Sequence, residues 1–377
     1  MKFTVSRDVL AEAVNWTART VPSRPSSPIL AGIRIKAENE TLSLSSFDYE
    51  ISAHAEVEAQ VEQTGDILIQ GRQLASIAKA LPNRDVECAI EDNKLVLKCG
   101  SSRFALANMN VEDYPTLPAV PPVKGKIDAQ VFAHTINQVS VAAATDETIP
   151  LLTGIRMEIE GDTITLLATD RYRLAMRTFQ WEPAESGIST SLLVKAKTLN
   201  DVAKNMAVAG EVEVAFNTGE TTGQSLIGFR AGGRHTTSTL MDGDYPPVRR
   251  LFPETTATTA LVNRADLLEA VKRVSLVAEQ KTSLRLAFSA GQVVLEAGQD
   301  DNAQATEIIT AQLNGEDIRT AFNPQYLQAG LSALNTQYVR FSFTDAAKPA
   351  VLTGQNEPLA EDDPSFRYLL MPIRFGV

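Results

Sequence analysis

The sequence is poor in the residues that build metal and redox sites. Among its 377 residues it holds only two cysteines, Cys88 and Cys99, and three histidines, His54, His134 and His235. None of these residues stands in a C-x-x-C or H-x-x-x-H spacing, so a dedicated zinc site has almost no ligands to use. We therefore expect no metal, no cofactor and no functional disulfide.

Long apolar runs are also missing. No stretch approaches the ~20 consecutive apolar residues that a membrane-spanning helix needs. The opening residues, MKFTVSRDVL, lack the apolar segment and the small-residue cleavage site of a secretory signal. The sequence therefore predicts a cytoplasmic protein.

Basic residues are outnumbered by acidic ones. The chain carries 35 Lys and Arg against 46 Asp and Glu, a formal net charge of -11. Because binding to phosphates depends on clustered Lys and Arg, this charge taken alone argues against nucleic acid. The objection weakens only if the basic residues gather on one surface and the acidic residues occupy another.

Recognisable catalytic motifs are absent from the sequence. There is no G-x-x-x-x-G-K-[ST] phosphate loop, no G-x-G-x-x-G, no G-x-S-x-G elbow and no H-E-x-x-H. Asp170, in the charged run 170–173, could act as an acid or base, but no second carboxylate or histidine stands at a defined spacing from it. We expect a protein that is not an enzyme, and an enzyme that uses Asp170 remains an alternative.

What the chain does contain is a long, degenerate, threefold repeat. In each copy a helix-like segment is followed by two strand-like segments in the same order. The matching segments are 6–21, 28–38 and 41–48 in the first copy, 128–144, 150–161 and 163–170 in the second, and 263–277, 283–291 and 292–300 in the third.

The second half of each copy opens with an alternating strand and continues into a helix. Residues 66–81 match residues 191–206 at a constant offset of 125, and residues 317–334 form the third version. Strands with period-2 alternation, interleaved with only two helices per copy, predict an α+β fold with antiparallel sheets. Stretches near 116–126 and 251–260 are rich in Pro or Thr and serve as joints. The predicted domains are therefore 1–122, 123–252 and 253–377.

Basic residues recur at matching helix positions. Arg72 and Lys79 are seven residues apart and so share one helix face, and Lys197 and Lys204 repeat this arrangement. A single Lys or Arg on an outer helix face is usually just solvated. Its recurrence in two copies favours contact with phosphates, which gives affinity without sequence information. The predicted DNA-binding residues are Arg24, Arg72, Lys79, Lys197, Lys204 and Arg273.

Four further segments complete a recognisable pattern over essentially the whole chain. With the repeat, they make the sequence resemble the β sliding clamp family, the β subunit of bacterial DNA polymerase III. The segments are Arg24-Pro25 before Pro28-Ile29-Leu30, the run Ala168-Thr169-Asp170-Arg171-Tyr172-Arg173-Leu174-Ala175, Asp244-Tyr245-Pro246 with Arg249-Arg250, and Tyr368-Leu369-Leu370-Met371-Pro372-Ile373-Arg374.

The resemblance implies a head-to-tail homodimer of three-domain subunits that closes into a ring around double-stranded DNA, the DNA clamp fold. Such a ring is a processivity factor with no catalytic site of its own. Its implied partners are the DNA polymerase III catalytic subunit, the clamp loader complex, and other polymerases and repair proteins that carry short clamp-binding peptides. A ring also answers the charge objection, because a topological link holds DNA without tight contacts.

By position, Phe104 and Leu106 on one side and Leu276 and Val277 on the other resemble the dimer interface of the family. Plain core packing is the alternative for these four residues. The resemblance also implies a hydrophobic groove for partner peptides between the second and third domains. Its residues would be Leu152, Thr169, Arg171, Tyr172, Leu174, Pro246, Arg250, Leu251, Leu370, Met371, Pro372, Ile373 and Arg374.

Two features of the groove depart from the family pattern. Arg171 and Tyr172 stand where better-known members carry Gly and His, so the preference for peptides could differ. The chain also continues past Arg374 into residues 375–377. An ordinary buried terminal strand would explain residues 369–373 equally well. The main rival interpretation of the whole chain is a repeat-built scaffold that assembles proteins without encircling DNA.

Overall fold

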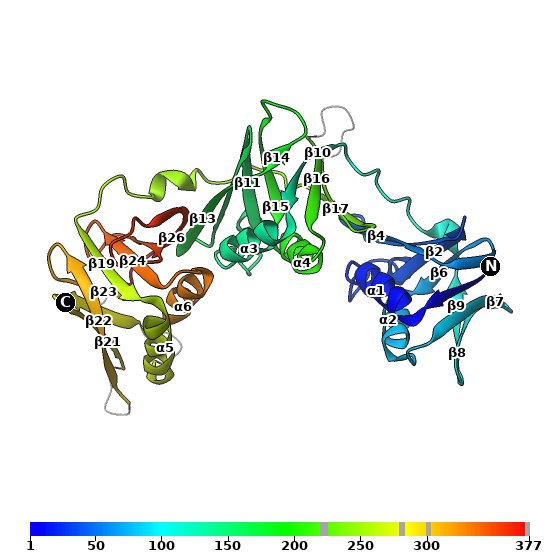
Figure 1. Cartoon of the computed structure of the whole chain (residues 1–377), viewed down its shortest axis with the longest axis horizontal. Coiled ribbons are helices and arrows are strands. Elements are labelled where there is room, and N and C mark those ends of the chain that lie inside the picture. The colour runs from blue at the N-terminus through cyan, green and yellow to red at the C-terminus, as the bar shows by residue number, and fades with distance from the viewer. Residues whose placement is uncertain (219–224, 279–282, 299–302, 374–377) are drawn as a thin grey trace. The chain divides into compact units, whose positions relative to one another are not determined.

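The computed structural model describes residues 1–218, 225–278, 283–298 and 303–373. Along this part of the chain the same order of elements occurs three times, which confirms the predicted repeat (Figure 1). Each copy has a strand, a helix, further strands, a second helix and three closing strands. The six α-helices of the described residues are α1 (Arg7–Ala18), α2 (Gly71–Ala80), α3 (Ala129–Ser140), α4 (Ala196–Met206), α5 (Arg264–Val274) and α6 (Pro324–Ala333).

The described chain forms two compact units, and the division between them runs through the central repeat. Each unit combines one whole terminal repeat with part of the central one. Unit 1 comprises Met1–Gln130, Glu182–Glu185 and Lys204–Leu240, and unit 2 comprises Val131–Trp181, Ser186–Ala203 and Met241–Val377.

Unit 1 contains one continuous antiparallel sheet that passes from the first repeat into the central repeat where β18 pairs with β4. Its 14 described strands lie in the order β14 (Glu182–Pro183), β10 (Val123–Asp128), β16 (Glu211–Thr218), β17 (Ser225–Ala231), β18 (Arg234–Thr239), β4 (Ile51–Glu58), β3 (Thr41–Phe47), β2 (Gly32–Glu38), β6 (Gly65–Gln70), β9 (Ser102–Met109), β8 (Lys94–Cys99), β7 (Asp85–Glu91), β1 (Lys2–Ser6) and β5 (Gln60–Gln63).

Unit 2 repeats this design, with the central and third repeats joined where β13 pairs with β26. Its 12 described strands lie in the order β15 (Ser189–Lys195), β11 (Gly154–Glu160), β12 (Thr163–Thr169), β13 (Arg173–Gln180), β26 (Asp363–Leu370), β25 (Ala350–Gln355), β24 (Tyr338–Phe343), β19 (Thr258–Asn263), β22 (Ala305–Asn314), β21 (Gln292–Ala297), β20 (Leu284–Ser289) and β23 (Ile318–Phe322).

Several helices begin at a capping side chain that is the last residue of the preceding strand or directly follows it. Ser6 Oγ accepts a hydrogen bond from Val9 N at the start of α1. Asn263 and Asn323 accept from the first free N–H groups of α5 and α6. Caps of this kind satisfy donors that the helix cannot pair internally. They therefore fix where each strand turns into a helix.

The prediction that residues 28–38 and 150–161 are strands throughout is wrong at their first residues. These begin as short 3₁₀ helices, Pro28–Ala31 and Pro150–Thr153, and the strands start only at Gly32 and Gly154. Proline has a fixed φ and no N–H to give to a ladder, so it opens the turn in place of pairing.

Asp-Tyr-Pro occurs twice, at residues 113–115 and 244–246, and its tyrosine has the same structural purpose in both places. Tyr114 and Tyr245 are buried, and their hydroxyls accept hydrogen bonds from Phe47 N at 2.8 Å and from Thr169 N at 3.1 Å. Burial raises the pKa of each hydroxyl to about 12. Each tyrosine thus fastens the start of an inter-repeat connector to the end of a strand in the repeat it leaves.

Cys88 and Cys99 are buried free thiols on neighbouring strands, and burial raises the pKa of Cys88 to about 12. Residues 230–235 form the hairpin between β17 and β18. No helix within the described ranges is long and apolar enough to cross a membrane.

Candidate peptide groove and basic helix faces

The joint between β13 and β26 in unit 2 is lined by apolar side chains on one face of the sheet. Leu174 lies opposite Leu369, and Leu369 lies opposite Val351 on β25, so the three side chains form one row. Each of them is almost fully buried. The cluster to which they belong comprises Leu152, Leu167, Leu174, Met176, Leu193, Tyr245, Val248, Phe252, Val351 and Leu369.

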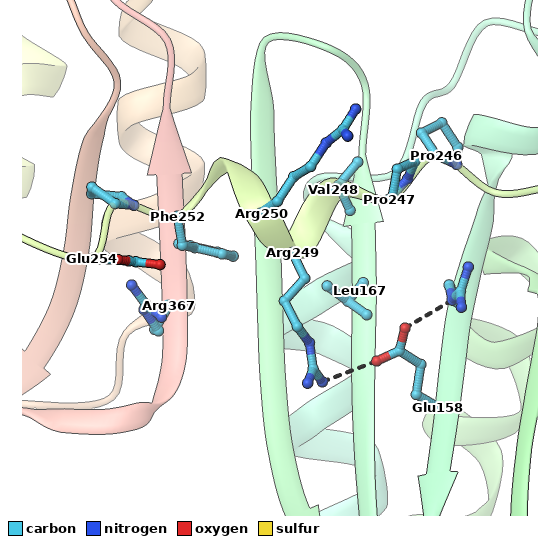
Figure 2. Close-up of a pocket in the computed structure, with 12 residues that line it drawn as sticks. Glu158, Leu167, Pro246, Pro247, Val248, Arg249, Arg250, Phe252, Glu254 and Arg367 are labelled. Atoms are coloured by element: carbon cyan, nitrogen blue, oxygen red, sulfur yellow. Dashed lines mark ion pairs between the residues drawn. The ribbon is translucent and has the colours of Figure 1, made fainter.

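The connector between the central and third repeats covers part of this row. Val248 and Phe252 point into the cluster and are buried, whereas Leu251 between them is 52% exposed. The short 3₁₀ helix Val248–Leu251 produces this division, and Figure 2 shows the side chains of Arg249 and Arg250 directed to opposite sides of it. The connector therefore presents both an apolar and a cationic side chain at the edge of the cluster.

The structure brings most of the predicted groove residues to this place. Leu152 and Leu174 belong to the cluster. Thr169 is the last residue of β12, and its backbone N–H donates to the hydroxyl of Tyr245. Several other predicted residues offer partly or fully exposed side chains next to it. These are Pro246, Arg250, Leu251, Met371, Pro372 and Ile373.

Leu370 does not fit the predicted groove, and Leu369 takes its place. Successive strand residues face opposite sides of a sheet, and Tyr368 points to α6, where its hydroxyl bonds Tyr326 O at 2.9 Å. Leu370 shares that face and is fully buried, while Leu369 lies in the cluster with Leu174. Arg374 lies outside the described residues.

The turn 170–173 is held by its own aspartate. Asp170 Oδ1 accepts from Tyr172 N and Arg173 N at 3.0 Å each, and Oδ2 accepts from Arg173 Nε at 2.9 Å. Arg171 takes a positive φ of 80° at the centre of the turn. The carboxylate is therefore committed to a structural role, which leaves the alternative of an Asp170 enzyme without support.

Arg171 and Tyr172, which depart from the family pattern, both lie on this turn and are both exposed. The Tyr172 ring stacks on Tyr326 of α6, with ring centroids 6.2 Å apart, and the Arg173 guanidinium lies 4.3 Å from the centroid of Tyr326. Tyr172 is 53% exposed even so. An aromatic side chain here gives the rim of the cluster a flat apolar surface.

Five of the six predicted DNA-binding residues are exposed and lack an acidic partner. Within the described residues no ion pair reaches Arg24, Arg72, Lys79, Lys197 or Lys204, and each is solvent-exposed. Arg273 differs, because its guanidinium pairs with Glu307, with Nε 3.1 Å from Oε2. A carboxylate neutralises its charge, so Arg273 is the weakest member of the set.

Each unit has an open strand edge among its described residues. In unit 1, β9 pairs with β6 only at Asn108 and Met109, so residues 102–107 are bonded only to β8. In unit 2, β22 pairs with β21 over residues 305–310 and with β19 only over 311–314. Such unpaired N–H and C=O groups form a template for another strand.

The four predicted dimer-interface residues lie at or near these edges. Phe104 on β9 is 37% exposed and Leu276, directly after α5, is 84% exposed. Val277 is half-buried, and Leu106 is buried within its own unit. Ile308, which the sequence reasoning missed, is 61% exposed on β22. The available signal in the sequence is the adjacent pair Ile308-Ile309, since neighbouring strand residues face opposite sides and one of the two must face outward.

The described residues contain no group of three or more His, Cys, Asp or Glu side chains placed to hold a metal ion.

Comparison with known proteins gives one consistent picture along the chain. Residues 1–118, 126–247 and 249–374 match the models of the N-terminal, central and C-terminal domains of the DNA polymerase III β subunit. A β sliding clamp of Streptomyces coelicolor is 50% identical over 376 residues, covering all of both chains. A β sliding clamp homologue, GriR, of Streptomyces muensis is 43% identical over 375 residues, again covering all of both.

Solved structures agree with these sequences. The sliding clamp of Bacillus subtilis is similar with a TM-score of 0.91 at 28% identity, covering all of both chains. A sliding clamp of Pseudomonas aeruginosa bound to griselimycin is similar with a TM-score of 0.90 at 27% identity, with the same coverage.

Proposed function

Because the chain belongs to the family of the bacterial DNA polymerase III β subunit, the β sliding clamps, we propose how its own residues carry out clamp function. The chain is a processivity factor, which tethers replication enzymes to DNA and catalyses no reaction itself. A polymerase that is tethered near its template rebinds at a high effective concentration. The full-length match to clamps, from the first strand to the last, carries this conclusion.

The two open strand edges support assembly as a head-to-tail homodimer. One edge, residues 102–107, belongs to the first repeat, and the other, residues 305–310, belongs to the third. Pairing the first edge of one copy with the second edge of another extends both sheets and leaves the same pair of edges to join again. Two such contacts between two copies close a ring. Phe104 and Ile308 would then be covered.

The basic residues of α2 and α4, together with Arg24 from the loop after α1, suit a surface that DNA can slide along. Arg24, Arg72, Lys79, Lys197 and Lys204 supply charge that no described carboxylate neutralises, whereas the chain as a whole is acidic. Contacts of this kind are made to phosphates and carry no sequence information. We assign these five residues to weak contact with the DNA backbone and Arg273 to a lesser part.

The apolar cluster at the β13–β26 joint is our candidate for the partner-peptide groove. An extended peptide would place apolar side chains against the cluster and the connector, and Met371 and Arg250 would adapt to its ends. We also propose the domain boundaries 1–122, 123–252 and 253–377, and a cytoplasmic location. The proposed groove residues are Leu152, Thr169, Arg171, Tyr172, Leu174, Pro246, Arg250, Leu251, Leu369, Met371, Pro372, Ile373 and Arg374.

The experiment that tests this function is retention on circular DNA. Labelled protein is loaded onto nicked circles with a matching clamp loader and ATP, and retention is followed before and after one cut linearises the circle. We expect the protein to stay on circles and to run off linear DNA, because the link is topological. Equal retention on both forms would mean contact binding, and failure to load with an active loader would favour the scaffold interpretation.

Two variants make the same experiment specific. Ile308→Asp places a charge on the edge of β22 and should prevent ring closure, so neither dimer nor retention is expected. The Arg24→Ala and Lys197→Ala double variant should remain dimeric but load less efficiently. Dimer content is measured by sedimentation velocity. Unchanged loading of the double variant would remove these two residues from the DNA-binding set.

A further inference from the structure

A pocket rich in arginine lies beside the proposed groove, on the same face of the unit 2 sheet. Its volume is about 1160 Å³, and its floor is the sheet while the connector forms its wall (Figure 2). The lining residues are Arg156, Glu158, Leu167, Pro246, Pro247, Val248, Arg249, Arg250, Phe252, Pro253, Glu254 and Arg367. Nothing in the clamp function described above uses its cations as a group.

The charges of this pocket do not balance. Four arginines face two glutamates, so the lining carries a net charge of +2 (4 − 2) in a chain whose own net charge is -11. Glu158 is shared, because Arg156 Nε lies 2.9 Å from its Oε1 and an Arg249 Nη2 lies 2.9 Å from its Oε2. One carboxylate therefore serves two guanidinium groups.

Arg250 and Arg367 have no carboxylate partner among the described residues, and of these two only Arg367 is withdrawn from solvent. It is half-buried with its guanidinium stacked 4.3 Å from the centroid of the Phe252 ring, and no described carboxylate lies within ion-pair distance of it. Desolvation lowers the pKa of Arg367, and the nearest acid that acts on it, Asp362, pairs with Arg340 at 3.5 Å. A cation removed from water in this way gains from an anionic ligand.

The pocket is continuous with the groove. Pro246 and Arg250 belong to both, and the strand register places the pocket floor one row further along the same face. Arg156, Leu167, Met176 and Arg367 form that row across β11, β12, β13 and β26. Adjacent rows on one face are about 7 Å apart, the span of two residues of an extended peptide.

We propose that this pocket binds an acidic side chain of the partner peptide, two residues beyond the segment that fills the groove. The inference rests on the proposed groove and adds the chemistry of the flanking residue. The carboxylate of an Asp or Glu at that position would lie between the guanidinium groups of Arg367 and Arg249, above the side chain of Leu167. The two glutamates and this apolar floor suit a single carboxylate better than the repeated phosphates of a nucleic acid.

The test compares five fluorescein-labelled peptides by anisotropy on the full-length protein. The first is the clamp-binding segment of the cognate DNA polymerase III catalytic subunit, and the others extend it by two glutamates or by two glutamines, at each end in turn. At one end, we expect glutamates to tighten binding about fivefold over glutamines at low salt. The gain should shrink as salt rises, because part of the pocket is open to solvent.

Three variants locate the effect. Arg367→Gln should abolish the glutamate gain and leave affinity for the unextended peptide unchanged, whereas Glu254→Gln should enlarge the gain by removing a repelling carboxylate. Arg319→Gln on β23 is the matched control, since it removes the same charge from an exposed arginine and should change nothing. Thermal unfolding of each variant confirms that it is folded.

The outcomes separate this inference from the groove on which it depends. If the unextended peptide does not bind, the groove assignment fails first. If it binds but glutamates and glutamines perform alike at both ends, or Arg367→Gln keeps the gain, the acidic pocket is wrong. Displacement of the glutamate extension by a single-stranded oligonucleotide, with the core peptide still bound, would show a phosphate site and also overturn it.

Discussion

The two places where the sheets pass from one repeat to the next are equivalent in backbone and opposite in chemistry. β4 pairs with β18 in unit 1 as β13 pairs with β26 in unit 2, each through five residue pairs. At matching positions, Ser52 and Thr237 stand in unit 1 where Leu174 and Leu369 stand in unit 2. The first pair is closed by a hydrogen bond of 2.5 Å between the hydroxyls.

The next row along each joint shows the same contrast. His54 and His235 stack at 4.4 Å in unit 1, where unit 2 has Met176 and Arg367. Ser43 Oγ lies 3.3 Å from His54 Nε2, and the hydroxyl of Thr236, on the opposite face, bonds Ser52 O. The polar side chains of the first joint hydrogen-bond to one another, whereas the apolar side chains of the second joint are shielded from water by the connector.

The repeat fixes the backbone of each joint, and the side chains at the joint decide whether it can bind a ligand. Small polar side chains pair across the strand and leave nothing for a ligand. Larger apolar side chains cannot pair in this way, so a connector covers part of them and leaves an edge for a peptide. We therefore expect no second peptide groove at the joint in unit 1, although both joints have the same strand pairing.

The largest expected effect comes from truncating a buried side chain of the apolar joint. Leu369→Ala removes a buried side chain from the cluster and should cost about 2–4 kcal/mol of unfolding free energy. It should also weaken partner-peptide binding by more than tenfold. Urea unfolding and fluorescence anisotropy measure the two effects. Thr237→Ala at the matching position of unit 1 is the control, and any loss of peptide affinity in it would contradict the comparison.

The second prediction concerns the loss of folding stability at acidic pH. Burial, with help from His54 and Arg230, lowers the pKa of His235 to about 4, and burial also lowers the pKa of His54. The unfolded chain, with a histidine pKa near 6.5, then binds protons that the folded chain does not. Stability is thus full above about pH 6.5 and falls as the pH drops toward 4, by roughly 2 kcal/mol after allowance for partial exposure.

The measurement for this prediction is urea unfolding at several pH values between 4 and 7. His235→Gln should flatten the curve in this window. His134→Gln in unit 2 is the comparison variant: burial and Arg177 also lower the pKa of His134, but less than that of His235, so this variant should flatten the curve less. A slope that persists in His235→Gln would show that other groups govern the acid response.

A smaller effect is expected from the hydroxyl pair of the polar joint. Thr237→Val keeps the shape of the side chain but leaves Ser52 without its partner, which should cost about 1 kcal/mol. Peptide affinity should not change. Equilibrium unfolding with the peptide titration repeated on the same sample checks both statements, and a stabilised variant would mean that the hydrogen bond contributes nothing.

The smallest expected effect lies at the rim of the apolar joint. Tyr172→Ala removes the ring that stacks on Tyr326 and should weaken peptide binding by about 0.5–1 kcal/mol, with little change in stability because the side chain is exposed. Calorimetric titration resolves a difference of this size. An unchanged affinity would place the bound peptide away from this turn.

Sequence alone predicted the threefold order of elements because the periodicity of each strand and helix is local. It predicted Leu174, Thr169 and Met371 from the resemblance. It placed Leu370 in the predicted groove, whereas the structure has Leu369 in the apolar cluster and Leu370 buried on the other face, because strand phase depends on which face α6 covers. It also missed the role of Phe252, since only the folded connector places that side chain in the cluster, and the pairing of Arg273 with Glu307, which is 34 residues away.

Hydrogen–deuterium exchange with and without the partner peptide tests the central claim most directly, because it reads both joints in one sample. We predict slower exchange in residues 169–176, 246–252 and 366–371 of unit 2, and unchanged exchange in residues 43–55 and 234–239 of unit 1. Protection of the polar joint, or none at the apolar joint while the peptide is bound, would contradict the assignment of partner binding to the β13–β26 joint.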